Sequence, residues 1–258
     1  FSSLGLFASM HHMSEWTFDK IQTYNTKVTG NFSDEEFKNR LLQSMYGEEL
    51  MEASAEIKFN GKKENVAFTG IESQDFLRLY DNEGKEIELE KGIALSRNTS
   101  NKLGIEVGDR LMWKFTGSDE WYLEVVKYIV RTPIAQGITM LKSEMDAEGI
   151  PFHTTSVIGE KPDKSLIDSD NVDSVQHKSD LKSALDMMLN ASVMLSVLFL
   201  VCAVLLGSVI LYNLGTLSYM ERYRDMATLK VLGFHNLRIK KLMIQQNLWL
   251  TIAGIIIG

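Results

Sequence analysis

The chain has 258 residues, a formal net charge of −7 and 45% hydrophobic residues, which is the average composition of a soluble globular protein. An acidic chain lacks the basic face that nucleic-acid binding requires, so we expect no nucleic-acid partner. A single cysteine, Cys202, excludes an intrachain disulfide framework and fits a bacterial surface better than a secreted scaffold.

Charge is segregated along the chain. It is dense and mainly acidic from Met13 to Asp186, and no Asp, Glu, Lys or Arg occurs from Met187 to Met220. A basic excess follows at Arg222, Arg224, Lys230, Arg238, Lys240 and Lys241. Phe1 to Met10 is apolar, too short to span a bilayer and without the basic region of a signal peptide. We therefore expect it to be the end of an earlier membrane helix.

The segment after this end predicts two helices. Trp16 to Tyr24 has apolar residues at helical spacing and could continue the first membrane helix outward. Ser33 to Glu36 is typical of an N-cap with acidic residues in the first turn. The helix that follows ends at Gly47 and carries four apolar residues, Phe37, Leu41, Leu42 and Met45.

Strands and turns come next. Ala53 to Phe59 and Asn65 to Ile71 are predicted strands, and Asn60-Gly61 between them is a strong hairpin turn. Asp81 to Gly84 predicts another turn, with strand-like alternation in Glu86 to Leu89. It lacks the further ligands and the terminal Glu of a calcium loop, so a plain turn is the better interpretation.

The rest of this region alternates between the two kinds of element. Gly104 and Gly149 end the predicted helices, and Pro133 stops the longest strand. The predicted elements are a helix at 94–103, a strand at 105–113, a strand at 121–131, a helix at 136–148 and a strand at 152–158. Lys161 to Asp180 is rich in Asp and Ser. Asp168, Asp170 and Asp173 are candidates to attract cations, but a solvated linker is the better interpretation of this segment.

Ala191 to Leu217 supplies the roughly 20 apolar residues that a membrane helix needs. The alternative, a buried helix of a soluble protein, rarely runs so long without a charge. The basic flank after this run marks the cytoplasmic side, so the region before it lies outside. The expected fold is an integral membrane α-helical protein with a mixed α+β extracytoplasmic domain inserted between the first and second membrane helices. The expected parts are residues 1–12 (end of a first membrane helix), 13–186 (extracytoplasmic domain, linker and stalk), 187–218 (membrane helix), 219–241 (cytoplasmic segment) and 242–258 (start of a third membrane helix).

Motifs for chemistry are absent from the sequence. It contains no G-x-x-x-x-G-K-[ST], H-E-x-x-H or G-x-S-x-G pattern. His11 and His12 are adjacent, so a helix would point them in different directions rather than at one metal. We expect no catalytic residue, no metal site and no cofactor in this chain.

Tyr219 to Phe234 predicts a short amphipathic helix on the cytoplasmic side. Met220, Tyr223, Ala227 and Val231 fall near one face, and Gly233 closes the helix. Periodicity alone leaves two interpretations open: a helix that lies on anionic lipid, and one that docks on a protein partner.

This segment resembles the E-R-x-R-E-I-A-x-L-K-x-L-G signature of FtsX-like, or MacB-type, ABC transporter permeases, with Asp225 in place of Glu and Met226 in place of Ile. Two further stretches are similar to the family: 94–111, with its L-S, K-L-G and V-G-D elements, and Gln246-Asn247 before the next apolar run. The region 128–155 is similar to large Gram-positive permeases with two such modules.

The resemblance implies a multi-pass protein of the bacterial plasma membrane, expected in a Gram-positive organism. Its partners would be a cytoplasmic ABC ATPase that binds the ATP, a second permease copy or module, the lipid bilayer, and an extracellular peptide, lipoprotein or hydrolase. The implied ATPase-coupling residues are Glu221, Arg222, Tyr223, Arg224, Asp225, Met226, Ala227, Leu229, Lys230, Leu232 and Gly233. The implied function is a non-catalytic permease subunit for export, extraction or resistance. A non-transporting subunit that relays ATPase state to a cell-wall hydrolase, or senses a ligand, is the alternative.

Overall fold

The computed structural model describes residues 9–10, 12–133, 135–231, 245 and 249. The chain divides into two compact units, Phe1–Ala191 and Ser192–Gly258. The elements are η1 (Trp16–Ile21), β1 (Thr26–Gly30), α2 (Glu35–Met45), β2 (Glu48–Phe59), β3 (Lys62–Ile71), β4 (Leu79–Tyr80), β5 (Glu86–Ile87), β6 (Ile93–Ser96), α3 (Arg97–Leu103), β7 (Arg110–Phe115), β8 (Tyr122–Val130), β9 (Gly137–Leu141), α4 (Lys142–Ala147), β10 (Ser156–Gly159), α5 (Lys164–Ile167), β11 (Val172–His177) and α6 (Lys178–Val231).

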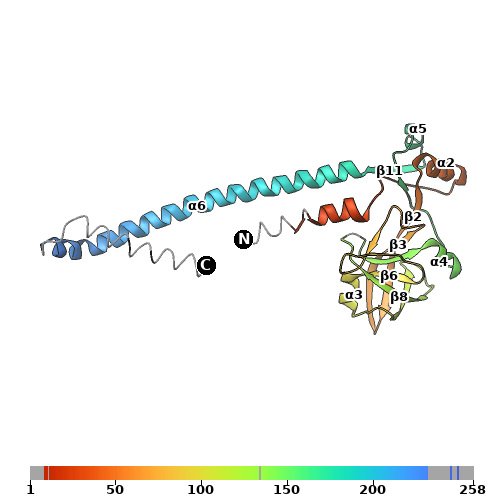
Figure 1. Ribbon diagram of the computed structural model, residues 1–258, viewed down its shortest axis with the longest axis horizontal. Helices are drawn as coiled ribbons and strands as arrows, with labels where there is room; N and C mark the ends of the chain where they lie inside the picture. The colour runs from red at the N-terminus through yellow and green to blue at the C-terminus, as the bar shows by residue number, and fades with distance from the viewer. Residues whose placement is uncertain (1–8, 11, 134, 232–244, 246–248, 250–258) are drawn as a thin grey trace. The chain divides into compact units, whose positions relative to one another are not determined.

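The first unit is built on one mixed sheet, in which Figure 1 labels β11, β2, β3, β6 and β8. The strand order is β11-β1-β10-β2-β3-β9-β6-β8-β7. An extra pairing of β2 with β7 closes the strands from β2 to β7 into a barrel. The long strand β2 serves both parts. Its residues 48–50 pair with β10 in the open part of the sheet, and its residues 55–58 pair with β7 in the barrel. The open part and the barrel therefore share β2 as a common wall.

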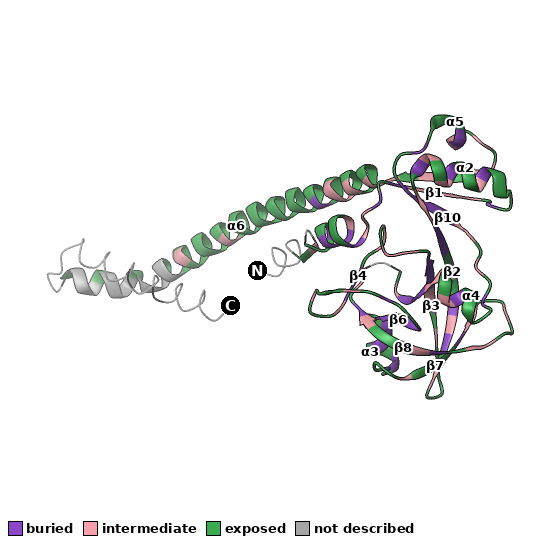
Figure 2. Ribbon diagram, turned by 45° about the vertical axis from the view of Figure 1, so that its right-hand side comes forward, coloured by how far each residue is buried: buried purple, intermediate pink, exposed green. Residues whose placement is uncertain are grey.

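Each part has its own apolar core. In the barrel, Phe68 stacks on Trp113 with ring centroids 4.8 Å apart, and Phe115 meets both rings edge-on. In the open part, α2 packs Phe37, Leu41 and Met45 against Val28 and Val157 of the sheet. Their spacing of four residues places these three side chains on one face of α2, which Figure 2 shows as purple patches on that helix.

Several predicted elements are confirmed. Asn60 and Gly61 both have positive φ, 47° and 79°, as the tight turn between β2 and β3 requires. The predicted turn at 81–84 is present, and Asp81 accepts hydrogen bonds from the backbone N–H groups of Glu83 and Lys85. The α2 helix is also present, but its N-cap is Asp34 rather than Ser33, and Tyr46 takes the left-handed conformation ahead of Gly47.

Two predictions of helix were wrong in their N-terminal parts. Residues 93–96 form β6 before α3 begins, and residues 137–141 form β9 before α4 begins. Both strands are almost fully buried, and each has one parallel neighbour, β8 and β3 respectively. Strands buried on both faces lose the alternation of polar and apolar residues that distinguishes a strand from a helix.

The predicted linker at 161–180 was also wrong. It contains the short helix α5 and the strand β11, which pairs antiparallel with β1. Val172 and Val175 pack against the core of the open part, while Asp173 and Ser174 between them are exposed. Most Asp and Ser residues of this segment lie outside β11, in and around α5, so its composition resembled that of a linker and hid the strand.

Helix α6 begins directly after β11 and runs from Lys178 to Val231 without a break, over 54 residues. Its stretch Lys178–Leu217 is the one helix among the described residues that is long and apolar enough to cross a membrane, with a mean hydropathy of 2.9 in its most apolar window. None of that window is buried in the protein. The expected membrane helices at the two ends of the chain fall mostly outside the described residues.

Candidate functional site

The predicted coupling segment forms the C-terminal end of α6. Met220, Tyr223 and Val231 are all strongly exposed, at 69%, 64% and 89%, and Ala227 is exposed as well. Their spacing puts all four on one side of the helix, as the sequence predicts. The segment is continuous with the apolar part of α6 and is not a separate short helix.

The structure places only part of the predicted site. Glu221, Arg222, Arg224, Asp225, Met226, Leu229 and Lys230 belong to α6 by their backbone, and their side chains are not described. Leu232, Gly233 and the Gln246-Asn247 pair lie outside the described residues. The helical character of the segment therefore rests on residues 219–231, and its predicted closing glycine has no structural account.

The other end of α6 is held against the segment that enters the first unit. The Lys182 ammonium pairs with both carboxylate oxygens of Asp19, at 2.9 and 3.0 Å. The ammonium group of Lys178 donates to the backbone oxygen of Gln22 at 2.9 Å. The backbone N–H of the same residue donates to the backbone oxygen of Asn25, also at 2.9 Å. We call these contacts the base clamp of α6.

The base clamp joins residues that are up to 163 positions apart in the sequence. It ties the entry and the exit of the first unit together, because η1 leads into β1 and β11 leads into α6. Burial lowers the pKa of Lys178, while the charge of Asp19 raises it. No local pattern in the sequence identifies these partners.

A second cluster of charges lies between the open part of the sheet and the barrel. Glu49 lies at the start of β2, and its carboxylate accepts a hydrogen bond from the Thr154 hydroxyl at 2.5 Å. The same carboxylate forms an ion pair with Lys142 of α4 at 3.2 Å. Lys38 of α2 lies 3.8 Å from the same carboxylate. Burial raises the pKa of Glu49, but the bonds from Thr154 and Lys142 outweigh it, so the pKa lies below its ordinary value.

This cluster lines an open cleft of about 690 Å³, which also takes in the loop at 150–155 and Asp173 of β11. Its volume is in the range of small-molecule sites. Glu35, Glu49, Lys38 and Lys142 in it are paired with one another, and the Thr154 hydroxyl donates to Glu49. We assign it a structural role, in which Glu49 links α2 to α4.

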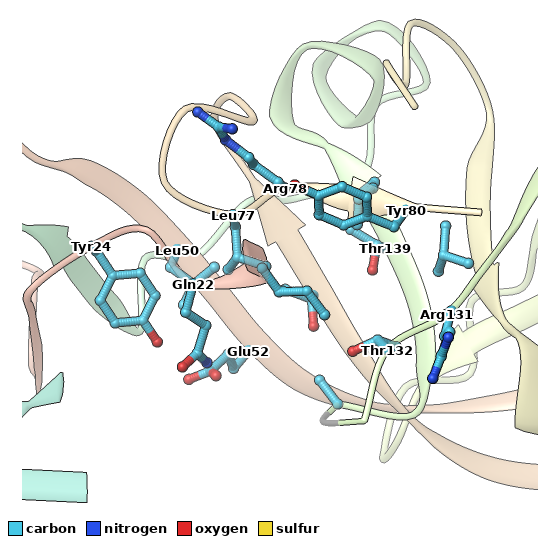
Figure 3. A pocket seen from close by; sticks show the side chains of 15 residues that line it. Gln22, Tyr24, Leu50, Glu52, Leu77, Arg78, Tyr80, Arg131, Thr132 and Thr139 are labelled. Carbon is cyan, nitrogen blue, oxygen red and sulfur yellow. The ribbon is translucent and has the colours of Figure 1, made fainter. Parts of the chain in front are cut away.

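A smaller hollow lies between β2, the segment after η1 and the end of β8 (Figure 3). Gln22 and Glu52 lie together on one side of it, and Arg131 and Thr132 lie on the other. Its volume is about 40 Å³, enough for a water molecule but far below that of a ligand site. Burial raises the pKa of Tyr24, which lines it, and the charge of Glu52 adds to this shift.

The described residues contain no group of three or more His, Cys, Asp and Glu side chains that could hold a metal ion. Among the predicted cation-attracting residues, Asp173 lies on β11, while Asp168 and Asp170 lie in the connection from α5. His11 and His235 lie outside the described residues. His177 takes part in the fold, because its Nδ1 lies 3.1 Å from the Thr26 hydroxyl.

Comparison with known proteins bears on the C-terminal part of the chain. Residues 197–258 match the model of the family described as FtsX-like permease C-terminal. This match confirms the resemblance that the Glu221–Gly233 motif suggested. A search of curated protein sequences found no match.

Solved structures similar to this chain include a periplasmic region and an extracellular domain. The periplasmic region of MacB from Actinobacillus actinomycetemcomitans has a TM-score of 0.43 and 12% identity, and the match covers 64% of this chain and 94% of that one. The extracellular domain of the noncanonic ABC-type transporter YknZ from Gram-positive bacteria has a TM-score of 0.39 and 13% identity, with 56% and 87% covered.

Proposed function

We propose that this chain is the permease subunit of an ABC transporter, in which α6 carries motion between an extracytoplasmic domain and a cytoplasmic ATPase. The observation that carries the proposal is the match of residues 197–258 to the FtsX-like permease family. That match covers the apolar part of α6 from Val197 onward together with the predicted coupling segment. The chain itself is a non-catalytic subunit in this proposal, and ATP is bound by the partner.

The length of α6 supports this role. A bilayer core takes about 20 helical residues, and α6 has 54. Residues therefore remain at both ends of the apolar run: the base clamp at one end and the Met220–Val231 face at the other. A continuous helix moves as a nearly rigid body, so a push on its cytoplasmic end reaches the outside domain.

The base clamp supports the same role. Because Lys182 holds α6 to η1 and Lys178 holds it to the segment between η1 and β1, a displacement of α6 acts on both connections of the outside domain at once. The pair of Lys182 and Asp19 is exposed, so it contributes little to stability on its own. The pair joins η1, which leads into the outside domain, to the start of α6, which leads out of it, and we assign it the role of positioning these two helices.

Substitution of Ala227 by Trp tests the coupling segment. The alanine lies exposed between Tyr223 and Val231 on the predicted docking face. A larger aromatic side chain favours a lipid interface, but overfilling a packed protein contact costs about 1–3 kcal/mol. We expect Ala227→Trp to insert normally in the membrane, and to lose about tenfold or more in ATPase co-purification and stimulated ATP turnover.

The matched control is Leu211→Trp, which adds the same ring within the apolar stretch of α6 and on the side of the helix opposite Met220. It should leave both assembly and turnover unchanged. Normal assembly and turnover in Ala227→Trp would contradict the docking role and return the segment to the membrane surface.

A transporter would also move substrate in reconstituted vesicles, whereas a regulatory subunit would alter hydrolase activity without such movement.

A further inference from the structure

One face of the barrel carries positive charge in a chain whose net charge is −7. On this face, outward side chains of adjacent strands lie in register. Lys63 of β3 lies opposite Lys58 of β2. Lys58 lies opposite Met112 of β7, and Met112 lies opposite Leu123 of β8. All four are exposed, with Met112 at 40% and Leu123 at 59%. We call this row, with its neighbours Glu56, Lys114 and Trp121, the lysine face.

The neighbouring row adds a third lysine. Lys114 lies opposite Glu56, and Glu56 also pairs with Lys63 at 2.7 Å. The ammonium groups of Lys114 and Lys63 lie 5.3 and 5.8 Å from the centre of the Trp121 ring. A hydrogen bond from Lys63 is the main cause that lowers the pKa of Glu56, and the charges of Lys114 and Lys58 lower it further. One carboxylate thus stands among three ammonium groups.

The stability of the isolated domain does not explain this arrangement. Like charges directly opposite each other on paired strands are destabilising, and Lys58 stands opposite Lys63. Two large apolar side chains beside them, Met112 and Leu123, remain in solvent. An acid at position 58 would pair with Lys63 and remove the repulsion. The observed residues instead combine three lysines, against the single carboxylate of Glu56, with an apolar surface.

The size of the lysine face sets the size of what it can bind. Adjacent strands lie about 4.8 Å apart, so a row across β3, β2, β7 and β8 is roughly 14 Å long. This equals about four residues of an extended chain, at about 3.3 Å for each residue. A row of this length suits a short segment rather than the broad surface of a stable dimer, which buries about 800 Å² on each partner.

We propose that the lysine face binds a short acidic segment of a partner protein, whose carboxylates meet Lys58, Lys63 and Lys114 and whose apolar side chain covers Met112 and Leu123. Charge complementarity selects an acidic partner, and the adjoining apolar pair selects a protein rather than a phosphate polymer. This surface belongs to the barrel, so the inference does not depend on the role of α6 in ATP coupling.

A photo-crosslinking amino acid at position 123 tests the proposal in the full chain, in the membrane of the producing cell. We expect an adduct with a second protein, and its crosslinked peptide should contain several Asp or Glu residues around an apolar one. Lys58→Glu should reduce the yield about tenfold, because it places like charges across the contact. Lys91→Glu, a reversal of another exposed lysine in the loop before β6, should leave the yield unchanged.

The same experiment includes a control for correct folding of the variant. Lys58→Glu replaces a repulsive pair with an attractive one, so its melting temperature should equal or exceed that of the parent chain. If it does not, Lys58→Gln repeats the measurement without reversing the charge. Absence of an adduct, an adduct with a second copy of this chain or with a non-protein polymer, or a yield that Lys58→Glu leaves unchanged would each overturn the proposal.

Discussion

Glu49 is the carboxylate at which the two parts of the first unit meet. It is nearly buried, and it binds Lys142 of α4 and Thr154 while lying close to Lys38 of α2. Glu49→Gln keeps the shape but removes the charge that both lysines face. We expect a loss of about 1–3 kcal/mol in the free energy of unfolding at neutral pH, measured by thermal melting of the full chain in detergent.

The pH dependence of this loss has a definite sign. Since the folded pKa of Glu49 lies below its ordinary value, its contribution is present above the unfolded pKa and is lost as the pH falls through the folded pKa. The melting temperatures of Glu49→Gln and the parent chain should therefore converge in acid. Exposed Glu36→Gln on the same helix α2 is the control. A difference that stays constant from neutral to acidic pH would contradict the assignment.

Glu124 shows the opposite case. It is buried on β8, and its burial together with the charges of Glu148 and Glu144 raises its pKa. The ionised carboxylate therefore destabilises the fold above the folded pKa, and this cost fades as the pH falls through that pKa. Glu124→Gln should stabilise the chain by about 1 kcal/mol at neutral pH, or about 2–4 °C.

The gain from Glu124→Gln should disappear at low pH, where the parent carboxyl is neutral as well. Glu88→Gln, at an exposed position, should show no gain at either pH. A melting temperature of Glu124→Gln that is lower than that of the parent chain at neutral pH would mean that the ionised carboxylate has a partner that stabilises it.

At the scale of single elements, the sequence predicted those whose signal is local. The Asn60-Gly61 turn, the β8 strand before Pro133 and the apolar run of α6 each carry their own pattern, and each is present. The β6 and β9 strands were missed because their neighbours come from distant parts of the chain and bury both faces.

A substitution on β11 tests directly whether this segment is a packed strand or a solvated linker. Asp at position 175 would be harmless in a solvated linker that already contains several Asp residues. On β11, Val175 packs against the core of the open part and lies opposite Val28 of β1. Val175→Asp should therefore lower the free energy of unfolding by about 1–3 kcal/mol. Ser174→Asp, on an exposed position of the same strand, should have no effect, and equal melting for the two variants would favour the linker.

At the scale of the whole molecule, the sequence predicted a mixed α+β unit followed by an apolar helix, and the described residues show both in this order. It also predicted the exposed apolar face of Met220, Tyr223, Ala227 and Val231, because helical periodicity is local. The base clamp, the cluster at Glu49 and the lysine face were not predictable. Each joins residues that only the sheet topology brings together, such as Asp19 with Lys182 and Lys58 with Met112.

The central claim is that α6 crosses the membrane, with the first unit outside and the coupling segment inside. Single cysteines at Ser165 of α5 and Ser218 of α6, in a Cys202→Ser background, test it with a membrane-impermeant thiol reagent on intact cells. The account predicts that the cysteine at 165 is labelled, and that the one at 218 is labelled only after the cells are permeabilised. Labelling at 218 in intact cells, with the cysteine at 165 protected, would place the coupling segment out of reach of any cytoplasmic ATPase and contradict the account.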